Sequence, residues 1–455
     1  MTLDILSFFP FKTIEPEQRA LLRAYARLPR NVQVVVLNVA VAGGKTALLE
    51  TIGRWEDAVG GGGATYLAPD NNLLGQVVGD TGWAPAPYKA RSGDWVREKL
   101  AWLNEPLKVA NYYSHLALRS YSRTILVDEA HNIKDMLQSM EGGKLWHHLT
   151  PWPLDTRTVE QFLYWLHTDP AASEYKALAR LIAKDPTNYT MKQERALYRG
   201  KEQLCMHIIP LTPKAARPVL WPPSKVGRIV LASATLSRED LTDMGLGQKY
   251  TAWLSAPSRI PVENRPLVYM PVAYPVYGRD KEIEKLAKTI KELSSYHKGE
   301  RGIVHVTYNI MDKLRPYLAA DKTFFFHTRS PVHKKRVFEA WLSTPGSVLI
   351  GAGFYEGINL KYDKASWQAI GKIMWPSLAD EATRIKSEVR PEWYLWEAMK
   401  YVMQAYGRIC RMPDDYGITY ILTGEFFRLY SECVKANLLP EWFIEAWEQR
   451  VWPWK

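Results

Sequence analysis

Two short apolar segments each end at a compact group of glycine, charged and hydroxyl residues, and this pairing constrains the fold more than any other feature. Val34–Val39 precedes the sequence GGKT at Gly43–Thr46, and Thr124–Val127 precedes DEAH at Asp128–His131. Short apolar runs predict buried strands, and residues that follow such strands meet at the carboxyl edge of a parallel sheet. The pattern therefore predicts an α/β protein with a ligand site at that edge.

The two groups together have the chemistry that binds a nucleoside triphosphate. Lys45 and Thr46 offer an ammonium and a hydroxyl beside the backbone N–H groups of a glycine-rich turn, which suits phosphates. Asp128 and Glu129 offer adjacent carboxylates for a nucleotide's Mg²⁺ and for an attacking water. The turn is irregular, because Val39 stands where the usual spacing has its first glycine. We expect the chain to bind and hydrolyse a nucleoside triphosphate.

Length and composition narrow the class of protein. A chain of 455 residues predicts two or three domains, and 47% hydrophobic with 24% charged residues is typical of a soluble globular protein. No run of about eighteen apolar residues occurs, so we expect no membrane span. Met1–Asp4 lacks the basic segment of a secretion signal, which predicts a cytoplasmic or nucleoid-associated protein. Cys205, Cys410 and Cys433 have no metal-ligand spacing and suit a reducing compartment.

The charge and the aromatic content favour a polyanionic partner. The net charge is +11 and the pI is near 9.2, although solvated lysines alone also give such values. The chain has 18 tryptophans and 25 tyrosines. Aromatic side chains beside a basic groove stack on bases, at ~1–3 kcal/mol per base, although we expect most of these rings to lie in cores or between domains. Nucleic acid is the predicted partner.

Strand patterns alternate with helical ones along the chain, which predicts parallel sheets in two domains. We expect these domains at 1–260 and 261–455, with prolines marking a linker near residues 255–268. Between the DEAH segment and the strand Ile229–Ser233, we expect a helical insertion at about 135–222. Its segments with helical spacing are Leu145–Trp146, Phe162–Leu166 and Tyr175–Ile182. The elements expected in the second domain are helices 281–294, 332–342 and 392–406 and strands 302–306, 323–326, 347–351, 367–374 and 417–422.

Two segments of the second domain have binding chemistry. Arg408 and Arg411 stand three residues apart near the end of the predicted helix 392–406, where this spacing places both side chains on one face. Fixed guanidinium groups are suited to a γ-phosphate, although a surface pair bonded to acids is the alternative. Gly351–Leu360 follows a predicted strand and is interrupted by glycines, so its backbone can approach a ligand closely.

In its order of motifs, almost the whole chain resembles the superfamily-two helicases of the XPD/DinG type. The GGKT and DEAH segments match the two nucleotide motifs of these helicases. The other matching segments are Pro16–Arg19 (RPxQ), Ala110–Leu116 (NYxxL), Ile209–Leu211 with Leu231–Leu236 (the run into SATL), Glu356–Asn359 (EGID), and Gln404–Arg411 with Asp414–Gly417 (QxxGRxxRxxxDYG).

The chain departs from this family at three places. Members with an iron–sulfur cluster have four cysteines between the two nucleotide motifs, whereas residues 47–127 contain none. We therefore expect no iron–sulfur cluster. The glycine-rich turn lacks the usual GTGKT form, and Asn359 stands where aspartate is common. The insertion corresponds to a small version of the family's arch domain.

The resemblance implies two RecA-like P-loop domains with parallel sheets and a helical arch-like insertion in the first. The implied activity is that of an ATP-dependent DNA helicase, which translocates on single-stranded DNA from 5′ to 3′ and has single-stranded or forked DNA as its partner. In the first domain, Gly43, Gly44 and Lys45 would bind phosphates, Thr46 and Asp128 would hold Mg²⁺, and Glu129 would act as general base. Gln18 would contact adenine and Gln404 the γ-phosphate, while Arg408 and Arg411 would stabilise transition-state charge. The residues that would couple the nucleotide to the strand are His131, Thr235 and Glu356.

Two alternatives stay open on the sequence alone. One is an ATP-driven translocase or remodeller that moves on nucleic acid without unwinding it. The other is a nucleic-acid-binding module whose irregular phosphate loop no longer turns over ATP. Strand release from a forked duplex separates the first from a helicase, and phosphate release separates the second.

Overall fold

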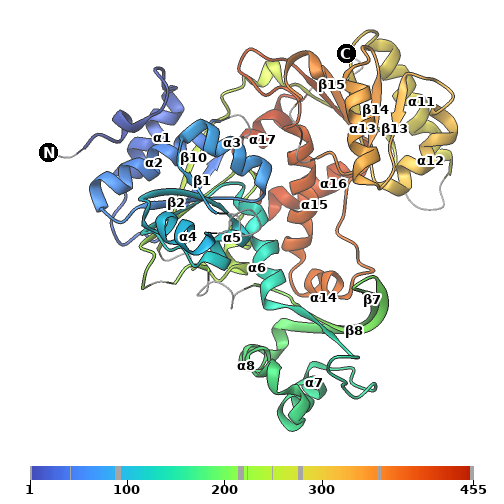
Figure 1. Ribbon diagram of the computed structural model, residues 1–455. Coiled ribbons are helices and arrows are strands. Elements are labelled where there is room, and N and C mark those ends of the chain that lie inside the picture. Colours follow the sequence, from blue (N-terminus) through green and yellow to red (C-terminus); the bar gives the residue numbers. More distant parts are fainter. Residues whose placement is uncertain are drawn as a thin grey trace. The chain divides into compact units, whose positions relative to one another are not determined.

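The computed structural model folds into two compact units (Figure 1). It describes residues 3–40, 43–87, 94–213, 220–222, 224–247, 250–274, 280–355, 358 and 360–450. The first unit contains residues 1–39, 44–256 and 377–389, and the second contains 40–43, 257–376 and 390–455. The units therefore differ from the two continuous ranges expected from the sequence at residues 40–43, 257–260 and 377–389, each of which belongs to the unit on the other side of the expected division.

A parallel sheet of seven strands is the centre of the first unit. Its order is β10-β1-β9-β5-β2-β4-β3, with every neighbouring pair parallel. The strands are β1 (Val34–Val39), β2 (Ala64–Ala68), β3 (Ala84–Pro85), β4 (Leu107–Asn111), β5 (Thr124–Val127), β9 (Arg228–Ser233) and β10 (Thr251–Ala256). Because β9 lies between β1 and β5, the segments that follow these three strands are neighbours at the carboxyl edge.

Helices cover both faces of this sheet, and this explains why its strands are apolar throughout. Val34 and Val36 of β1 belong to one hydrophobic core, and Val35 and Leu37 belong to the other. The helices α1 (Pro16–Ala26), α2 (Lys45–Gly60) and α3 (Asn71–Thr81) pack into the core of Val35 and Leu37. Four other helices pack into the core of Val34 and Val36: α4 (Trp95–Asn104), α5 (Tyr112–Leu118), α6 (Ile133–Glu141) and α10 (Arg238–Asp243).

The insertion between β5 and β9, drawn in green in Figure 1, is helical only in part. It contains α7 (Val159–Thr168) and α8 (Lys176–Lys184), together with β6 (Gly143–Trp146), β7 (Tyr189–Tyr198) and β8 (Lys201–Pro210). The three strands form an antiparallel sheet in the order β6-β8-β7. The expected helical spacing at Leu145–Trp146 is therefore wrong, since both residues lie in β6. Arg199 and Gly200 both have positive φ, and they form the two-residue turn that joins β7 to β8.

The second unit contains a parallel six-stranded sheet in the order β11-β16-β15-β12-β14-β13. Its strands are β11 (Leu267–Ala273), β12 (Gly302–His305), β13 (Phe324–Phe326), β14 (Val348–Gly351), β15 (Trp367–Ile370) and β16 (Ile418–Thr423). Its helices are α11 (Asp280–Tyr296), α12 (Tyr308–Leu318), α13 (Pro331–Leu342), α15 (Pro391–Tyr406), α16 (Phe426–Lys435) and α17 (Glu441–Glu448). The alternation of strand and helix explains the parallel sheet, because each crossover returns the chain to the same edge.

The helix α14 (Glu381–Val389) follows β15 in the sequence but belongs to the first unit. Lys386 of α14 donates a hydrogen bond from Nζ to Oδ2 of Asp243 in α10 at 2.6 Å, and both side chains are buried. Lys134 of α6 donates to Asp240 of α10 at 2.7 Å, again in a buried pair. The short helix α10 therefore receives two lysines from different parts of the chain.

Two further observations concern the chain as a whole. In the part that the structure describes, no helix is both long enough and apolar enough to cross a membrane. Cys205, Cys410 and Cys433 are all buried and free of disulfides.

Candidate nucleotide-binding site

The GGKT segment contains the end of the turn that follows β1 and the first two residues of α2. Gly44 has φ 76° and stands at the N-cap of α2, which begins at Lys45. This left-handed conformation is easily adopted by glycine and costly for other residues. The first turn of a 16-residue helix presents N–H groups and a partial positive charge to an anion. Gly44, Lys45 and Thr46 thus have the local geometry of a phosphate-binding turn, while Val41 and Ala42 lie outside the described residues.

The acidic pair follows β5 directly and lies beside this turn. Asp128 is buried, whereas the side chain of Glu129 is about a third exposed. Nζ of Lys45 lies 3.3 Å from Oε1 of Glu129. Glu129 has φ 45°, a left-handed conformation that is uncommon outside glycine and typical of constrained sites. The structure therefore brings Lys45, Asp128 and Glu129 together within the first unit.

The carboxylate of Asp128 has a fixed set of donors. Oδ2 accepts a hydrogen bond from the hydroxyl of Tyr66 at 2.7 Å, and Oδ1 accepts one from the backbone N–H of Glu129 at 2.9 Å. Burial raises the pKa of Asp128 and the nearby charge of Glu129 raises it further, whereas Lys45 and the Tyr66 hydrogen bond lower it. Burial also raises the pKa of Tyr66 well above its ordinary value, so its hydroxyl stays a proton donor.

These surroundings fit a divalent cation. Two neighbouring carboxylates, one of them buried, repel each other, and a cation between them offsets both charges. Oxygen atoms of carboxylates and hydroxyls are the ligands that Mg²⁺ takes, usually through one or two carboxylates together with phosphate oxygens. Thr46 supplies a hydroxyl nearby, since burial raises the pKa of Tyr66 and the neighbouring Thr46 side chain lowers it.

His131 connects the acidic turn to the segment after β9. Its Nδ1 lies 3.0 Å from Oγ of Ser233 and 3.5 Å from Oε2 of Glu129. Oγ of Ser233 accepts a hydrogen bond from the backbone N–H of Thr235 at 3.1 Å. Thr235 is buried. The two residues predicted to couple the nucleotide to the strand, His131 and Thr235, are therefore joined through Ser233.

Gln18, predicted to contact adenine, lies in the first turn of α1. Its Oε1 accepts a hydrogen bond from the backbone N–H of Glu15 at 3.3 Å, and the two residues form a capping box at the start of the helix. Gln18 is buried. The adenine contact stays a prediction, because the observed contact is one that caps the helix.

In the second unit, Arg408 and Arg411 lie beyond the helix on which the sequence pattern had placed them. The helix α15 ends at Tyr406, and neither arginine is helical. Their spacing of three residues therefore does not put them on one helical face, and that expectation is wrong. Gly407 and Arg408 form a turn at the end of the helix, and Ile409 then forms an isolated parallel β-bridge with Leu360.

Other contacts hold each guanidinium near the end of α15. Arg408 donates from Nε to the backbone oxygen of Gln404 at 2.9 Å and from Nη1 to that of Ile358 at 3.2 Å. Arg411 donates from Nη1 to the backbone oxygen of Gly407 at 3.3 Å. Both arginines are thereby ordered within the second unit. Glu356, predicted as a coupling residue, lies outside the described residues.

Two tyrosines of the site were not singled out by the sequence patterns. Tyr66 lies in the middle of β2, where only the register between β2 and β5 reveals that its hydroxyl reaches Asp128. Tyr112 begins α5, and its hydroxyl donates to the backbone oxygens of Asp128 at 2.5 Å and Glu129 at 3.2 Å. Tyr112 lies in the segment Ala110–Leu116 that matches NYxxL, but that match does not predict this contact.

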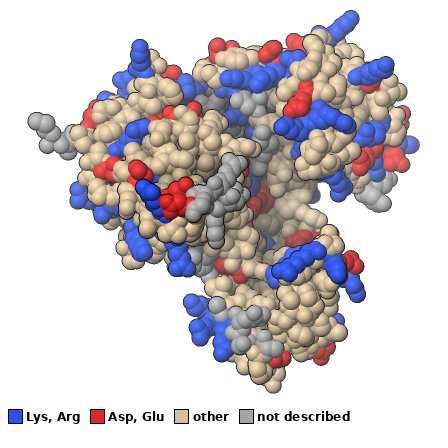
Figure 2. All heavy atoms as spheres, in the orientation of Figure 1, with Lys and Arg blue, Asp and Glu red and all other residues tan. Residues whose placement is uncertain are grey.

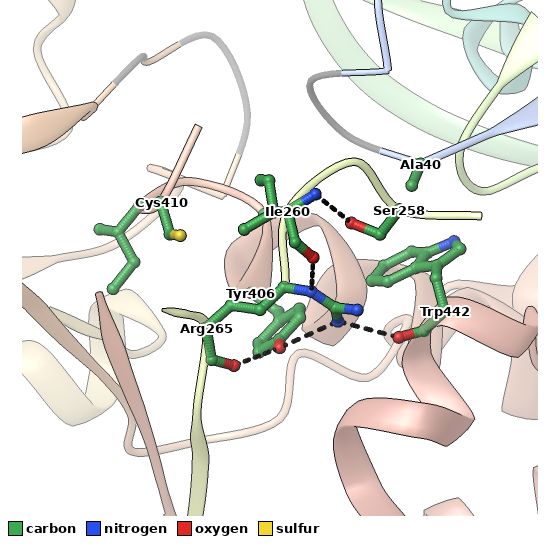
Figure 3. Close-up of a pocket in the computed structure, with 9 residues that line it drawn as sticks. Ala40, Ser258, Ile260, Arg265, Tyr406, Cys410 and Trp442 are labelled. Atoms are coloured by element: carbon green, nitrogen blue, oxygen red, sulfur yellow. Dashed lines mark hydrogen bonds between the residues drawn. The ribbon is translucent and has the colours of Figure 1, made fainter. Parts of the chain in front are cut away.

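A small cavity in the second unit lies beside Arg265 (Figure 3). Its volume of about 20 Å³ is enough for a single water molecule and too small for a nucleotide. The guanidinium of Arg265 donates to the backbone oxygens of Ile260 at 3.1 Å and Trp442 at 3.0 Å, as Figure 3 shows. Arg265 also forms an ion pair with Glu445 at 2.9 Å. The arginine is therefore a structural support of this unit.

Comparison with known proteins agrees with the fold and with the order of the motifs. Residues 290–441 match the helicase C-terminal domain family. A solved XPD helicase has a TM-score of 0.62 and 15% identity, and the match covers 94% of this chain and 99% of that one. Xpd4 of S. tokodaii has a TM-score of 0.61 and 12% identity, with 96% and 99% covered. A solved XPD without ligand gives a TM-score of 0.62 at 16% identity, with 92% and 98% covered. No curated protein matches the chain by sequence.

These matches define the chain as a protein with the fold of a nucleic-acid helicase built on two RecA-like domains. Residues 290–441 match the helicase C-terminal domain family, and the chain as a whole has the fold of the XPD helicases. The resemblance drawn from the order of the motifs is confirmed.

Proposed function

We propose that the protein is an ATP-dependent DNA helicase that moves along single-stranded DNA from 5′ to 3′. The observation that carries the proposal is the gathering of Lys45, Asp128 and Glu129 at one sheet edge, with Lys45 Nζ 3.3 Å from Glu129. The helicase C-terminal domain at residues 290–441 supports it independently. DNA as the substrate and the direction of movement rest on the resemblance to XPD/DinG-type helicases.

The ion pair between Lys45 and Glu129 suggests how nucleotide prepares the site. Phosphate oxygens bind an ammonium more strongly than a single carboxylate does, because they carry more charge. Lys45 would therefore turn to the β- and γ-phosphates, and Glu129 would become free to orient a water as general base. Thr46 and Asp128 would hold Mg²⁺, which when bound neutralises phosphate charge. The nucleotide itself thus releases the base.

Two further roles extend this mechanism along the chain. Arg408 and Arg411 would stabilise the charge that develops on the γ-phosphate in the transition state. His131, Ser233 and Thr235 would report the state of the γ-phosphate to the strand-binding surface, since they form one hydrogen-bonded series that begins beside Glu129. Hydrolysis would then alternate the protein between two states on the strand.

The charge of the protein supports a nucleic-acid partner without defining a path for it. The net charge is +11, and association with a polyanion is favoured by such a surplus. Figure 2 shows lysine and arginine side chains spread over the visible surface, with acidic side chains among them. The nucleotide site, and not a basic patch, is therefore the main support for the proposed function.

Phosphate release from ATP, measured with and without single-stranded DNA, tests this proposal. We expect DNA to stimulate the wild type, while Lys45→Ala loses nucleotide affinity and Glu129→Gln binds ATP but fails to hydrolyse it. Single-stranded RNA in place of DNA tests the choice of strand. Normal turnover in both variants would contradict the site, and strand binding without any phosphate release would favour a nucleic-acid-binding module.

A further inference from the structure

Two buried tyrosine hydroxyls hold the acidic pair from different sides. Tyr66 reaches the side chain of Asp128, whereas Tyr112 reaches the backbone oxygens of both Asp128 and Glu129. Tyr66 comes from β2 and Tyr112 from the start of α5, so separate elements converge on this turn. Both tyrosines are buried, and burial raises the pKa of each well above its ordinary value. Both hydroxyls therefore remain donors.

Tyr66 fixes the plane of the Asp128 carboxylate. With Oδ2 bound by Tyr66 and Oδ1 bound by the N–H of Glu129, the carboxylate has one favoured orientation, and each oxygen keeps a lone pair for another ligand. The Thr46 side chain lies near the same tyrosine, close enough to affect the pKa of its hydroxyl. Tyr66 therefore bonds one of the two side chains that fit Mg²⁺ and lies near the other, and groups in this relation to metal ligands tune metal affinity.

Tyr112 fixes the backbone of the turn that carries Glu129. A residue other than glycine is strained at φ 45°, and such a conformation persists only where its surroundings determine it. The hydroxyl of Tyr112 donates to the oxygens of two consecutive peptide groups, that between Asp128 and Glu129 and that between Glu129 and Ala130. It thereby limits the rotation of the turn, and with it the direction of the Glu129 side chain.

We propose that Tyr66 and Tyr112 are positioning residues of the nucleotide site, with separable effects. Tyr66 holds Asp128 in the orientation that binds a divalent cation together with Thr46. Tyr112 holds the turn that directs Glu129 toward the attacking water. This inference rests on the proposed function, because it assigns the two hydroxyls to the binding and chemical steps of ATP hydrolysis.

Tyr66→Phe, Tyr112→Phe and Tyr25→Phe test this proposal together. Tyr25 is a matched control: it is a buried tyrosine of the same unit whose hydroxyl donates to a carboxylate, Oε1 of Glu56, at 2.6 Å. Binding of a fluorescent ADP analogue is measured over a range of Mg²⁺ concentrations, and phosphate release and thermal unfolding are measured in parallel. All three variants lose one hydroxyl and keep the ring, so a purely structural role would affect all three alike.

We expect Tyr66→Phe to raise the Mg²⁺ concentration for half-maximal ADP binding by about tenfold, as loss of a group behind a metal ligand typically does. Tyr112→Phe should lower kcat by about tenfold at saturating Mg²⁺ and leave the Mg²⁺ dependence of binding unchanged. Tyr25→Phe should lower the melting temperature alone. As a second test, Tyr66→Phe/Asp128→Asn is compared with Asp128→Asn, and we expect the same Mg²⁺ dependence in both, because the hydroxyl acts through the carboxylate.

The outcomes separate this inference from the proposed function. A wild type that binds ADP and hydrolyses ATP, with Tyr66→Phe and Tyr112→Phe no different from Tyr25→Phe, would overturn the inference alone. A further loss of Mg²⁺ affinity in Tyr66→Phe/Asp128→Asn relative to Asp128→Asn would also overturn it, because the hydroxyl would then act independently of the carboxylate. A wild type that binds no nucleotide would overturn both.

Discussion

His131 and Ser233 lie 102 residues apart in the sequence, and Nδ1 of the histidine is 3.0 Å from Oγ of the serine. Both are buried at the carboxyl edge of neighbouring strands, His131 after β5 and Ser233 at the end of β9. His131 also lies 3.5 Å from Glu129. This contact thus connects the proposed general base with the segment that precedes α10.

Ser233→Ala should uncouple nucleotide hydrolysis from the strand. The variant should bind ATP normally, because the hydroxyl of Ser233 bonds to His131 and Thr235, but stimulation of phosphate release by single-stranded DNA should fall by about fivefold or more. Ser122→Ala is the control, since Ser122 is also buried in this unit and its Oγ pairs with Thr65 at 2.8 Å. Equal stimulation in wild type and Ser233→Ala would remove the coupling role.

Arg408→Ala and Arg411→Ala should lower turnover more than they weaken ATP binding. Arginines that reach a γ-phosphate contribute on the order of 10³–10⁵ in rate in nucleotide hydrolases, whereas an exposed surface pair contributes nothing to chemistry. Single-turnover hydrolysis at saturating ATP and DNA measures the effect, with the exposed Arg428→Ala as control. A decrease below about threefold, or about 0.65 kcal/mol, in both variants would rule out the assignment.

Lys386→Met should destabilise the first unit strongly. Lys386→Met removes one partner of the buried carboxylate of Asp243, and breaking a buried ion pair in this way typically costs about 3–5 kcal/mol. Lys386→Met/Asp243→Asn should recover part of this loss, because the remaining buried charge is gone. Lys435→Met breaks an exposed pair with Glu432 and should change the free energy of unfolding by only ~0–1 kcal/mol. Denaturant unfolding of the four proteins compares them, and similar values for Lys386→Met and Lys435→Met would argue against a buried pair.

The sequence indicated most of the secondary structure near the site. The strands β1, β5 and β9 are continuous apolar runs because helices cover both sheet faces, and this pattern is visible without the structure. Lys45, Asp128 and Glu129 follow such runs directly, so their convergence follows from the parallel arrangement. The antiparallel hairpin β7–β8 was missed, although Gly200 marks its turn, because its strands carry many polar residues and only one face is buried.

Other features depend on contacts between distant segments, which no local pattern reveals. The hydroxyl of Tyr66 reaches Asp128 only through the pairing of β2 with β5. The helix α14 looks like part of the second domain in sequence, but the burial of Lys386 against Asp243 assigns it to the first unit. The end of α15 at Tyr406 likewise depends on the pairing of Leu360 with Ile409, a contact across 49 residues.

Strand separation of a forked DNA duplex, with ATP and Mg²⁺, tests the central claim most directly. One strand is labelled, and forks with a single 5′ tail or a single 3′ tail are compared. We predict that the wild type releases the labelled strand from the 5′-tailed fork when ATP is present, and that Glu129→Gln releases none. ATP hydrolysis and movement along the tail without release of the strand would contradict a helicase and identify a translocase instead.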